Sequence, residues 1–311
     1  MSTVEARAGA EIVTGGPGGP AGPGAARAAV PRDAGRRVRG NTWRLLGSEV
    51  GLTFRRPRNL VMLAVLALVP AVIGVVLRTV SAGGAEGDAG AIIGAVAGNG
   101  MLLAFVSLFV LVPLLLPVAV AVVAGDAIAG EASLGTLRYL LAAPAGRTRL
   151  LAVKYVNAVV FGLAATAVVA ASALVTGFAL FPIGPVTLLS GSTIPVAEGM
   201  LRVLIAVAYV GAGMAALSAL ALAVSTLTEA PIGAIAGTVV FVILTQVLST
   251  IPQLAVIEPY LLTSYLPRFD GALRDPVATE EMTRGLLAFA AHIAVCGSFA
   301  WARFHSRDVT S

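Results

Sequence analysis

Six long apolar runs, separated by shorter polar stretches, form the dominant pattern of this 311-residue sequence. They cover residues 60–77, 101–124, 156–178, 201–226, 232–251 and 285–302. Each has about the twenty residues that a helix needs to cross the hydrocarbon core of a bilayer. The pattern predicts an all-α polytopic membrane protein with six transmembrane helices. Pro113 and Pro117 predict a kink in the second helix, and a Gly-rich loop is expected before it.

A shorter amphipathic pattern precedes the first run. Trp43, Leu46, Val50 and Phe54 recur at spacings of three or four, with polar residues between them. This spacing predicts an N-terminal amphipathic helix over residues 41–58 that lies in the membrane interface. Residues 1–40 are rich in Gly, Pro and Arg and are expected to form a disordered cytoplasmic tail. The six-helix domain is then expected over residues 59–305, with a short C-terminal tail over residues 306–311.

Composition and charge agree with a membrane protein and predict its orientation. The chain is 58% hydrophobic and only 12% charged, which is too apolar for an ordinary soluble domain. Sixteen of the 21 Lys and Arg residues fall on the side of the membrane that holds the N-terminus. Because cytoplasmic flanks carry the excess of Lys and Arg, both termini are expected in the cytoplasm, with the protein in the cell membrane. The basic surplus lies in the first 58 residues, so no nucleic-acid partner is predicted.

Candidate catalytic groups are sparse. The sequence has no GxSxG, HExxH or GxxxxGK[ST] motif, and its single cysteine is Cys296. His292 has no other His, Asp or Glu within the sixth run with which to complete a metal site. No catalytic, cofactor-binding or metal-binding residue is therefore predicted in this chain. Gly233 and Gly237 form a GxxxG pattern in the fifth run, which permits close helix contact and is a candidate dimer face.

Residues 125–155 form the one long charged segment between two strongly apolar runs, and the orientation predicts that it is cytoplasmic. It contains Asp126, Glu131, Arg138, Arg147, Arg149 and Lys154. Its interior predicts a short helix over residues 134–142, ended near Pro144 and Gly146. Leu134, Leu137, Arg138 and Leu141 would share one side of that helix. Such a partly apolar helix fits the groove of a soluble partner, although a solvated loop joining two spans would have the same pattern.

This segment resembles the cytoplasmic loop of ABC-2 type transporter permeases. The residues that carry the resemblance are Glu131, Gly135-Thr136-Leu137, Leu140-Leu141, Pro144, Arg147 and Lys154. The resemblance implies that the chain is the transmembrane permease subunit of an ABC exporter and forms its translocation pathway. Two permease copies would each dock a separate ATP-binding subunit, which would hold ATP and Mg²⁺ and carry out the hydrolysis. The first and fifth spans would meet across the dimer.

The resemblance also assigns roles to individual residues. It implies that the ATPase-docking residues are Glu131, Gly135, Thr136, Leu137, Arg138 and Leu141. Two alternatives stay open at this point. One is a membrane-embedded enzyme that uses His292, and the other is a carrier not driven by ATP, or a scaffold. The identity of the substrate and the choice between a homodimer and a heterodimer also stay open.

Overall fold

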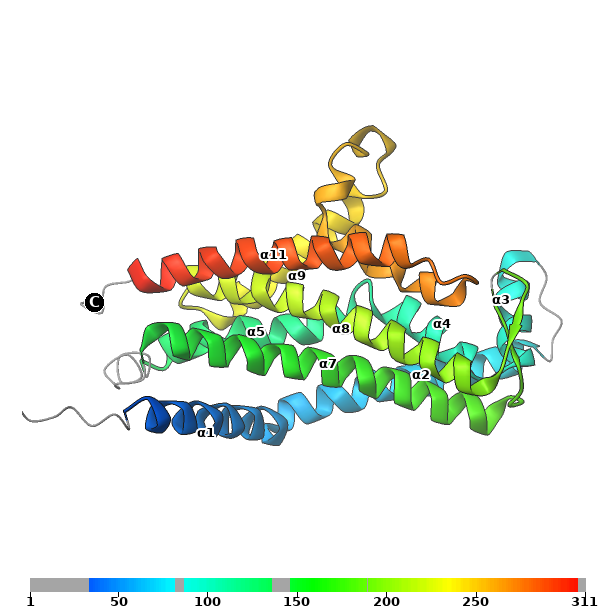
Figure 1. Ribbon diagram of the computed structural model, residues 1–311, viewed down its shortest axis with the longest axis horizontal. Helices are drawn as coiled ribbons and strands as arrows, with labels where there is room; N and C mark the ends of the chain where they lie inside the picture. Colours follow the sequence, from blue (N-terminus) through cyan, green and yellow to red (C-terminus); the bar gives the residue numbers. More distant parts are fainter. Residues whose placement is uncertain (1–33, 82–86, 136–145, 189, 307–311) are drawn as a thin grey trace, which may run out of the picture.

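The computed structural model describes residues 34–81, 87–135, 146–188 and 190–306 as a bundle of long helices (Figure 1). The helices of the bundle are α1 (Ala34–Arg55), α2 (Pro57–Ser81), α3 (Gly87–Gly98), α4 (Leu102–Leu111), α5 (Leu115–Ser133), α7 (Arg147–Leu180), α8 (Val196–Leu227), α9 (Pro231–Leu248) and α11 (Thr279–Ser306). Short turns η1 (Pro252–Leu254), η2 (Glu258–Tyr260), α10 (Leu262–Tyr265) and η3 (Leu266–Leu273) link α9 to α11. Strands β1 (Val186–Thr187) and β2 (Thr193–Ile194) pair antiparallel between α7 and α8.

Within the described residues, six helices are long and apolar enough to cross a membrane: α2, α5, α7, α8, α9 and α11. This confirms the predicted class of an all-α protein with six membrane spans. The helix α1 begins and α11 ends at one end of the bundle, which we call the terminal end (Figure 1). The β1–β2 hairpin lies at the opposite end, which we call the hairpin end.

The second predicted span is broken rather than kinked. Helix α4 ends at Leu111 and α5 begins at Leu115, with Pro113 between them. Pro113 lacks the N–H that would continue the helix, and its ring clashes with the preceding turn. Pro117 lies in the first turn of α5, where backbone N–H groups have no partner within the helix, so it does not break the helix. The expected kink at the two prolines is therefore a break at one of them.

Two predictions for the N-terminal part of the chain are wrong. Helix α1 begins at Ala34, so the last seven residues of the expected disordered tail are helical, while residues 1–33 lie outside the described part. The expected Gly-rich loop after the first span contains α3, an apolar helix. Glycine weakens helices in water, but in an apolar environment a helix is the way in which a single segment can satisfy its own backbone hydrogen bonds.

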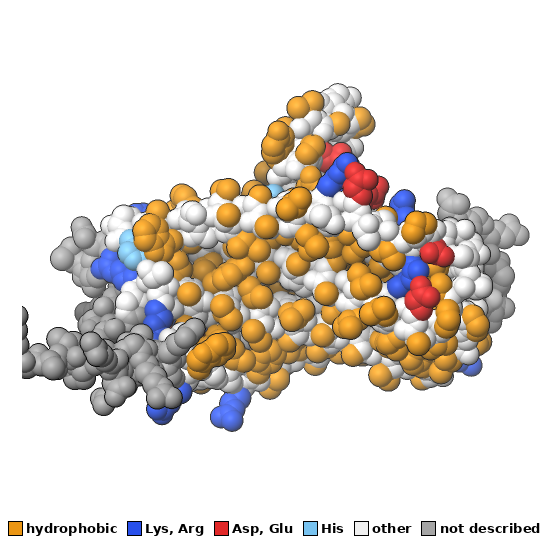
Figure 2. Space-filling view, in the orientation of Figure 1, with side chains coloured by type: hydrophobic (Ala, Val, Ile, Leu, Met, Phe, Trp, Pro, Cys, Tyr) orange, Lys and Arg blue, Asp and Glu red, His pale blue; other side chains and the backbone are white. Residues whose placement is uncertain are grey.

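Helix α8 is the centre of the bundle and α2, α9 and α11 are its periphery. Two thirds of the apolar window of α8 is buried, and the helix packs on α5, α7 and α11. The peripheral helices turn many apolar side chains outward, such as Leu68 of α2 and Val295 of α11. Figure 2 shows such side chains over the middle of one face of the bundle. This pattern is the reverse of a soluble protein and is the one expected where lipid surrounds the bundle.

The hairpin end is held by a buried arginine. Arg202, nearly two turns into α8, donates from its guanidinium to the Glu198 carboxylate and to the backbone carbonyls of Ala272 and Arg274. Its side chain is only 6% exposed. The hydroxyl of Ser192 in the hairpin donates to Asp275. The spacing of four between Glu198 and Arg202 is thus an ion pair within α8, and the bonds from Arg202 to Ala272 and Arg274 tie α8 to the segment before α11.

Two glycines allow a close helix contact near the same end. A Cβ built on Gly177 of α7 would lie 2.0 Å from the carbonyl oxygen of Gly100, which precedes α4. A Cβ built on Gly100 would lie 2.2 Å from the carbonyl oxygen of Gly177. No side chain fits at this separation, so both positions require glycine. The contact sets how closely α7 approaches the start of α4.

Candidate functional site

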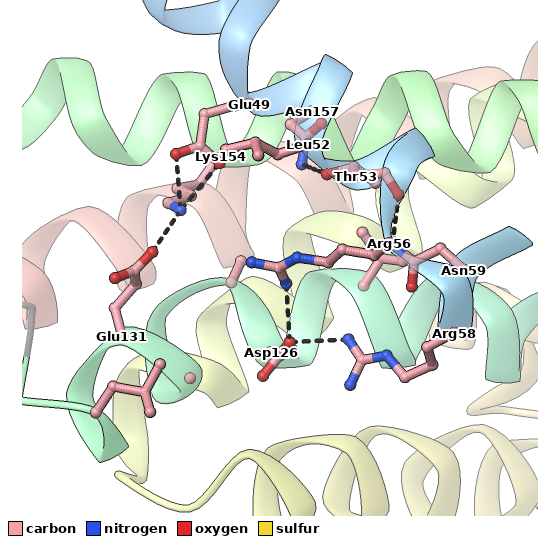
Figure 3. Close-up of a pocket in the computed structure, with 14 residues that line it drawn as sticks. Glu49, Leu52, Thr53, Arg56, Arg58, Asn59, Asp126, Glu131, Lys154 and Asn157 are labelled. Atoms are coloured by element: carbon pink, nitrogen blue, oxygen red, sulfur yellow. Dashed lines mark hydrogen bonds and ion pairs between the residues drawn. The ribbon is translucent and has the colours of Figure 1, made fainter.

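The candidate site is a polar cavity of about 90 Å³ near the terminal end, between α1, α2, α5 and α7 (Figure 3). Six charged side chains line it, together with two asparagines and a threonine. The residues are Glu49 and Thr53 of α1, Arg56 at the junction of α1 and α2, Arg58 and Asn59 of α2, Asp126 and Glu131 of α5, and Lys154 and Asn157 of α7. We refer to this set as the charged site.

Lys154 is the central residue of the charged site. Its ammonium group lies 3.0 Å from both carboxylate oxygens of Glu49 and 3.1 Å from Oε1 of Glu131. The Lys154 side chain is 7% exposed, whereas those of Glu49 and Glu131 are about a quarter exposed. An ammonium group has three hydrogens to donate, and here three oxygens accept them. One buried cation therefore joins the end of α5 to α1 through α7.

A second set of ion pairs lies on the other side of the cavity. Asp126 of α5 accepts from Arg58 at 2.8 Å and from Arg56 at 3.4 Å, both through Oδ2. The two guanidinium groups are about half exposed and the carboxylate is mostly buried. The last two turns of α5 are thus held by charge at two points, Asp126 and Glu131. Both partners of Asp126 come from the short junction between α1 and α2.

Neutral polar groups complete the walls of the cavity. The side-chain amide of Asn59 donates to the carbonyl of Thr53, and that of Asn157 donates to the Thr53 hydroxyl (Figure 3). Both asparagines are almost fully buried, and their Oδ1 atoms have no hydrogen-bond partner among the described residues. A cavity of this volume and polarity is large enough for water to reach such groups. Together with the ion pair of Lys154 and Glu49, the contact between Asn157 and Thr53 links α7 to α1.

Local sequence explains why α1 packs here. Phe54 packs against Phe161 of α7 with ring centroids 5.9 Å apart and the ring planes tilted by 40°; Phe161 lies about two turns beyond Lys154 in α7. Leu46 and Val50 are half-buried, as the predicted apolar face of this helix requires. Trp43 is 72% exposed, and with Leu46 it lines a shallow groove against Val153 and Val156 of α7.

The predicted docking residues fall in two groups. Glu131 and Gly135 are described: Glu131 lies in α5, and Gly135 follows the helix with a φ of +67°, a left-handed conformation that favours glycine. Thr136, Leu137, Arg138 and Leu141 lie outside the described residues, as does most of the predicted helix over residues 134–142. Asp126 and Glu131 lie in a helix rather than in a loop, because α5 runs to Ser133.

Sequence reasoning missed most of the charged site. It placed Lys154 just before the third span, but α7 begins at Arg147 and buries Lys154 within the helix. Glu49 was only a polar position of the amphipathic helix, and nothing in the sequence paired it with a lysine 105 residues away. The available signal was that each apolar run begins or ends with charged residues that need partners when helices pack.

The remaining candidate residues are described but lie outside the charged site. His292 of α11 donates from Nδ1 to the carbonyl of Ala288 in its own helix. Gly233 and Gly237 are exposed on α9, where a Cβ on Gly237 would meet Val224 at 3.4 Å. In the part of the chain that the structure describes, no three His, Cys, Asp or Glu side chains are grouped so that they could hold a metal ion.

These features define a polytopic membrane protein with a buried charged site where α1, α2, α5 and α7 meet near one end. The chain belongs to the family described as protein of unknown function DUF2705, whose family model matches residues 89–310. The match includes Asp126, Glu131 and Lys154 but not Glu49, Arg56 or Arg58. No curated protein matches the chain.

Proposed function

We propose that this protein is the transmembrane permease subunit of an ATP-binding cassette transporter, docking a separate ATPase through residues 125–155. Helix α5 leads into the docking segment, and α7 leads out of it. Ion pairs at Asp126 and Glu131 hold the end of α5 in place. Yet Leu134, directly after α5, is 77% exposed. A fixed helix end that presents an apolar side chain is suited to binding a soluble partner, and this observation carries the proposal.

The distribution of charge supports a cytoplasmic position for the terminal end. Figure 2 shows Lys and Arg side chains gathered there, whereas basic and acidic side chains occur together toward the hairpin end. Arg202, Arg274 and Arg284 each pair with an acidic residue four positions earlier. The positive-inside rule then favours cytoplasmic termini and places the docking segment beside a cytoplasmic ATPase.

In this proposal the ATPase supplies ATP and Mg²⁺, and this chain supplies the pathway through the membrane. Two permease copies would pair, with the exposed Gly233 and Gly237 of α9 as a candidate contact between them. The direction of transport would be export. The substrate would cross between helices, driven by movements that ATP binding produces at the docking segment.

The proposal is tested by co-expressing the chain with an ATPase encoded beside its gene and purifying the complex. We expect the ATPase to co-purify with the native chain and its binding to be lost in Leu137→Asp. The matched control is Thr187→Asp, which adds the same charge on an exposed strand at the hairpin end and should leave binding intact. Retention of the ATPase by Leu137→Asp, or its absence from the native complex, would count against the proposal.

A further inference from the structure

Ser225, near the end of α8, has a buried hydroxyl that contacts the backbone of α5. It donates to the carbonyl of Gly125 at 2.6 Å and accepts from the amides of Ile128 and Ala129 at 3.2 and 2.9 Å. No part of the Ser225 residue is exposed. Of the three groups that it contacts, two are the ends of one potential helical hydrogen bond.

In an α-helix the amide of Ala129 bonds the carbonyl of Gly125, four residues earlier. The hydroxyl of Ser225 reaches both of these groups, so it acts as an inserted link between them. Side chains that enter the hydrogen-bond ladder in this way are a recognised cause of bending in helices. At residues 125–129 the backbone of α5 is therefore bonded to α8 through one hydroxyl, within a helix that stays continuous from Leu115 to Ser133.

The surroundings show why this point sits where it does. A Cβ on Gly125 would lie 3.2 Å from the backbone nitrogen of Ile235 in α9, so the first turns of α9 pack closely on α5. The turn between α8 and α9 is tight, with the amide of Ala230 donating to the Thr228 hydroxyl. Helix α5 is thus enclosed by α8 and α9 at the level of Ser225. At this level it carries Asp126, and beyond it Glu131, to the charged site.

We propose that Ser225 is a positioning residue that transmits displacement of the last turns of α5 to α8. Only the source of the displacement, an ATPase at the docking segment, rests on the function proposed above. The link itself is a property of this chain. Because α8 packs on α5, α7 and α11, a shift of its end reaches most of the bundle.

Ser218 provides a matched control on the same helix. It is also fully buried, but its hydroxyl donates to the carbonyl of Met214 within α8. Ser218→Ala and Ser225→Ala each remove one buried hydroxyl from α8, and only the second removes a link to α5. A general effect of losing a buried hydroxyl would appear equally in both variants.

The first measurement is hydrogen exchange of the full chain in lipid nanodiscs. In Ser225→Ala we expect exchange at the amides of Ile128 and Ala129 to become about tenfold faster, the loss expected for a hydrogen bond of ordinary strength. Ser218→Ala should leave these two amides unchanged, and Ser225→Thr, which keeps the hydroxyl, should restore part of their protection. Unchanged exchange in Ser225→Ala would overturn the proposal.

The second measurement tests transmission without an ATPase. In a Cys296→Ser background, spin labels are attached at cysteines replacing the exposed Leu227 of α8 and Val295 of α11. Glu131→Gln weakens the hold of Lys154 on the end of α5, and we expect the label distance to shift by about 1–2 Å. The shift should persist with Ser218→Ala and vanish with Ser225→Ala.

The outcomes separate the two proposals. No shift on Glu131→Gln, or an equal shift in the Ser225→Ala background, would overturn the role of Ser225. If the shift behaves as expected while the neighbouring ATPase neither binds nor alters the distance, the role of Ser225 stands and the proposed transporter function fails.

Discussion

Replacing Lys154 with methionine is the most direct test of the charged site. Methionine keeps an unbranched side chain, shorter by one heavy atom, and removes the charge. The carboxylates of Glu49 and Glu131, which both lie within 3.1 Å of the ammonium group, would then face each other across the cavity without a cation between them. Like charges at this proximity repel, and a carboxylate removed from its partner must recover its hydration or take up a proton.

The expected loss of unfolding free energy follows from how far Lys154, Glu49 and Glu131 are buried. Removing one member of a buried ion pair costs about 3–5 kcal/mol of unfolding free energy. Because the carboxylates of Glu49 and Glu131 are about a quarter exposed, water offsets part of the loss, and we expect a cost of roughly 2–3 kcal/mol for Lys154→Met. The matched control is Arg284→Met. Its pair with Glu280 is largely exposed on both sides, so the change should stay within about 0.5 kcal/mol.

The assay is unfolding in mixed micelles with an increasing fraction of denaturing detergent, compared among variants by the midpoint. A triple variant, Lys154→Met with Glu49→Gln and Glu131→Gln, removes all three charges and should recover most of the stability, since a neutral replacement of a buried ionic group costs little. A midpoint for Lys154→Met equal to that of the native chain would refute the reasoning. So would a triple variant no more stable than the single one.

Three further predictions test other parts of the fold in the same unfolding assay. Gly177→Ala should destabilise the protein by about 2 kcal/mol or more, because its Cβ would overlap the carbonyl of Gly100, whereas Gly297→Ala meets no atom within 4 Å and should be neutral or slightly stabilising. Arg202→Met should cost about 3 kcal/mol, since the carbonyls of Ala272 and Arg274 and the Glu198 carboxylate lose their donor; a loss no larger than that of Arg284→Met would show that these contacts of Arg202 are dispensable. Phe54→Ala should cost about 2 kcal/mol through lost packing on Phe161, and labelling of a cysteine placed in α1 should report its detachment from α7.

Much of the bundle follows from the apolar runs, because a helix in lipid must satisfy its own backbone and needs a fixed minimum length. The ends of the helices do not follow from this. Helix α7 has 34 residues and is about 51 Å long at 1.5 Å per residue, well beyond a hydrocarbon core of about 30 Å. The predicted third span covered only the apolar part and left the first turns, with Lys154, outside the helix. Membrane thickness sets a minimum for a helix and no maximum.

The charged site could not be predicted for a different reason. Three of its four ion pairs join residues more than 60 positions apart, such as Arg58 with Asp126 and Lys154 with Glu49. Each partner appears locally as an ordinary charge at the edge of an apolar run. Only the packing of α1 along α7 brings Glu49 to Lys154, and that packing includes the contact of Phe54 with Phe161. The resemblance of residues 131–154 to a docking loop identified Glu131, but gave no partner for it within the chain.

Lys154 shares its hydrogen bonds unequally between α1 and α5. Glu49 accepts two of the hydrogen bonds that the Lys154 ammonium group donates among the described residues, and Glu131 accepts one. Withdrawal of Glu131 would leave the buried cation still paired, which avoids the large penalty of an isolated charge. Loss of this one contact leaves the end of α5 held at Asp126 by Arg56 and Arg58. Ser225 links α5 to α8 close to the same place. Glu131, which shares one hydrogen bond with Lys154, lies on the helix that leads into the proposed docking segment, where a partner protein would apply its force.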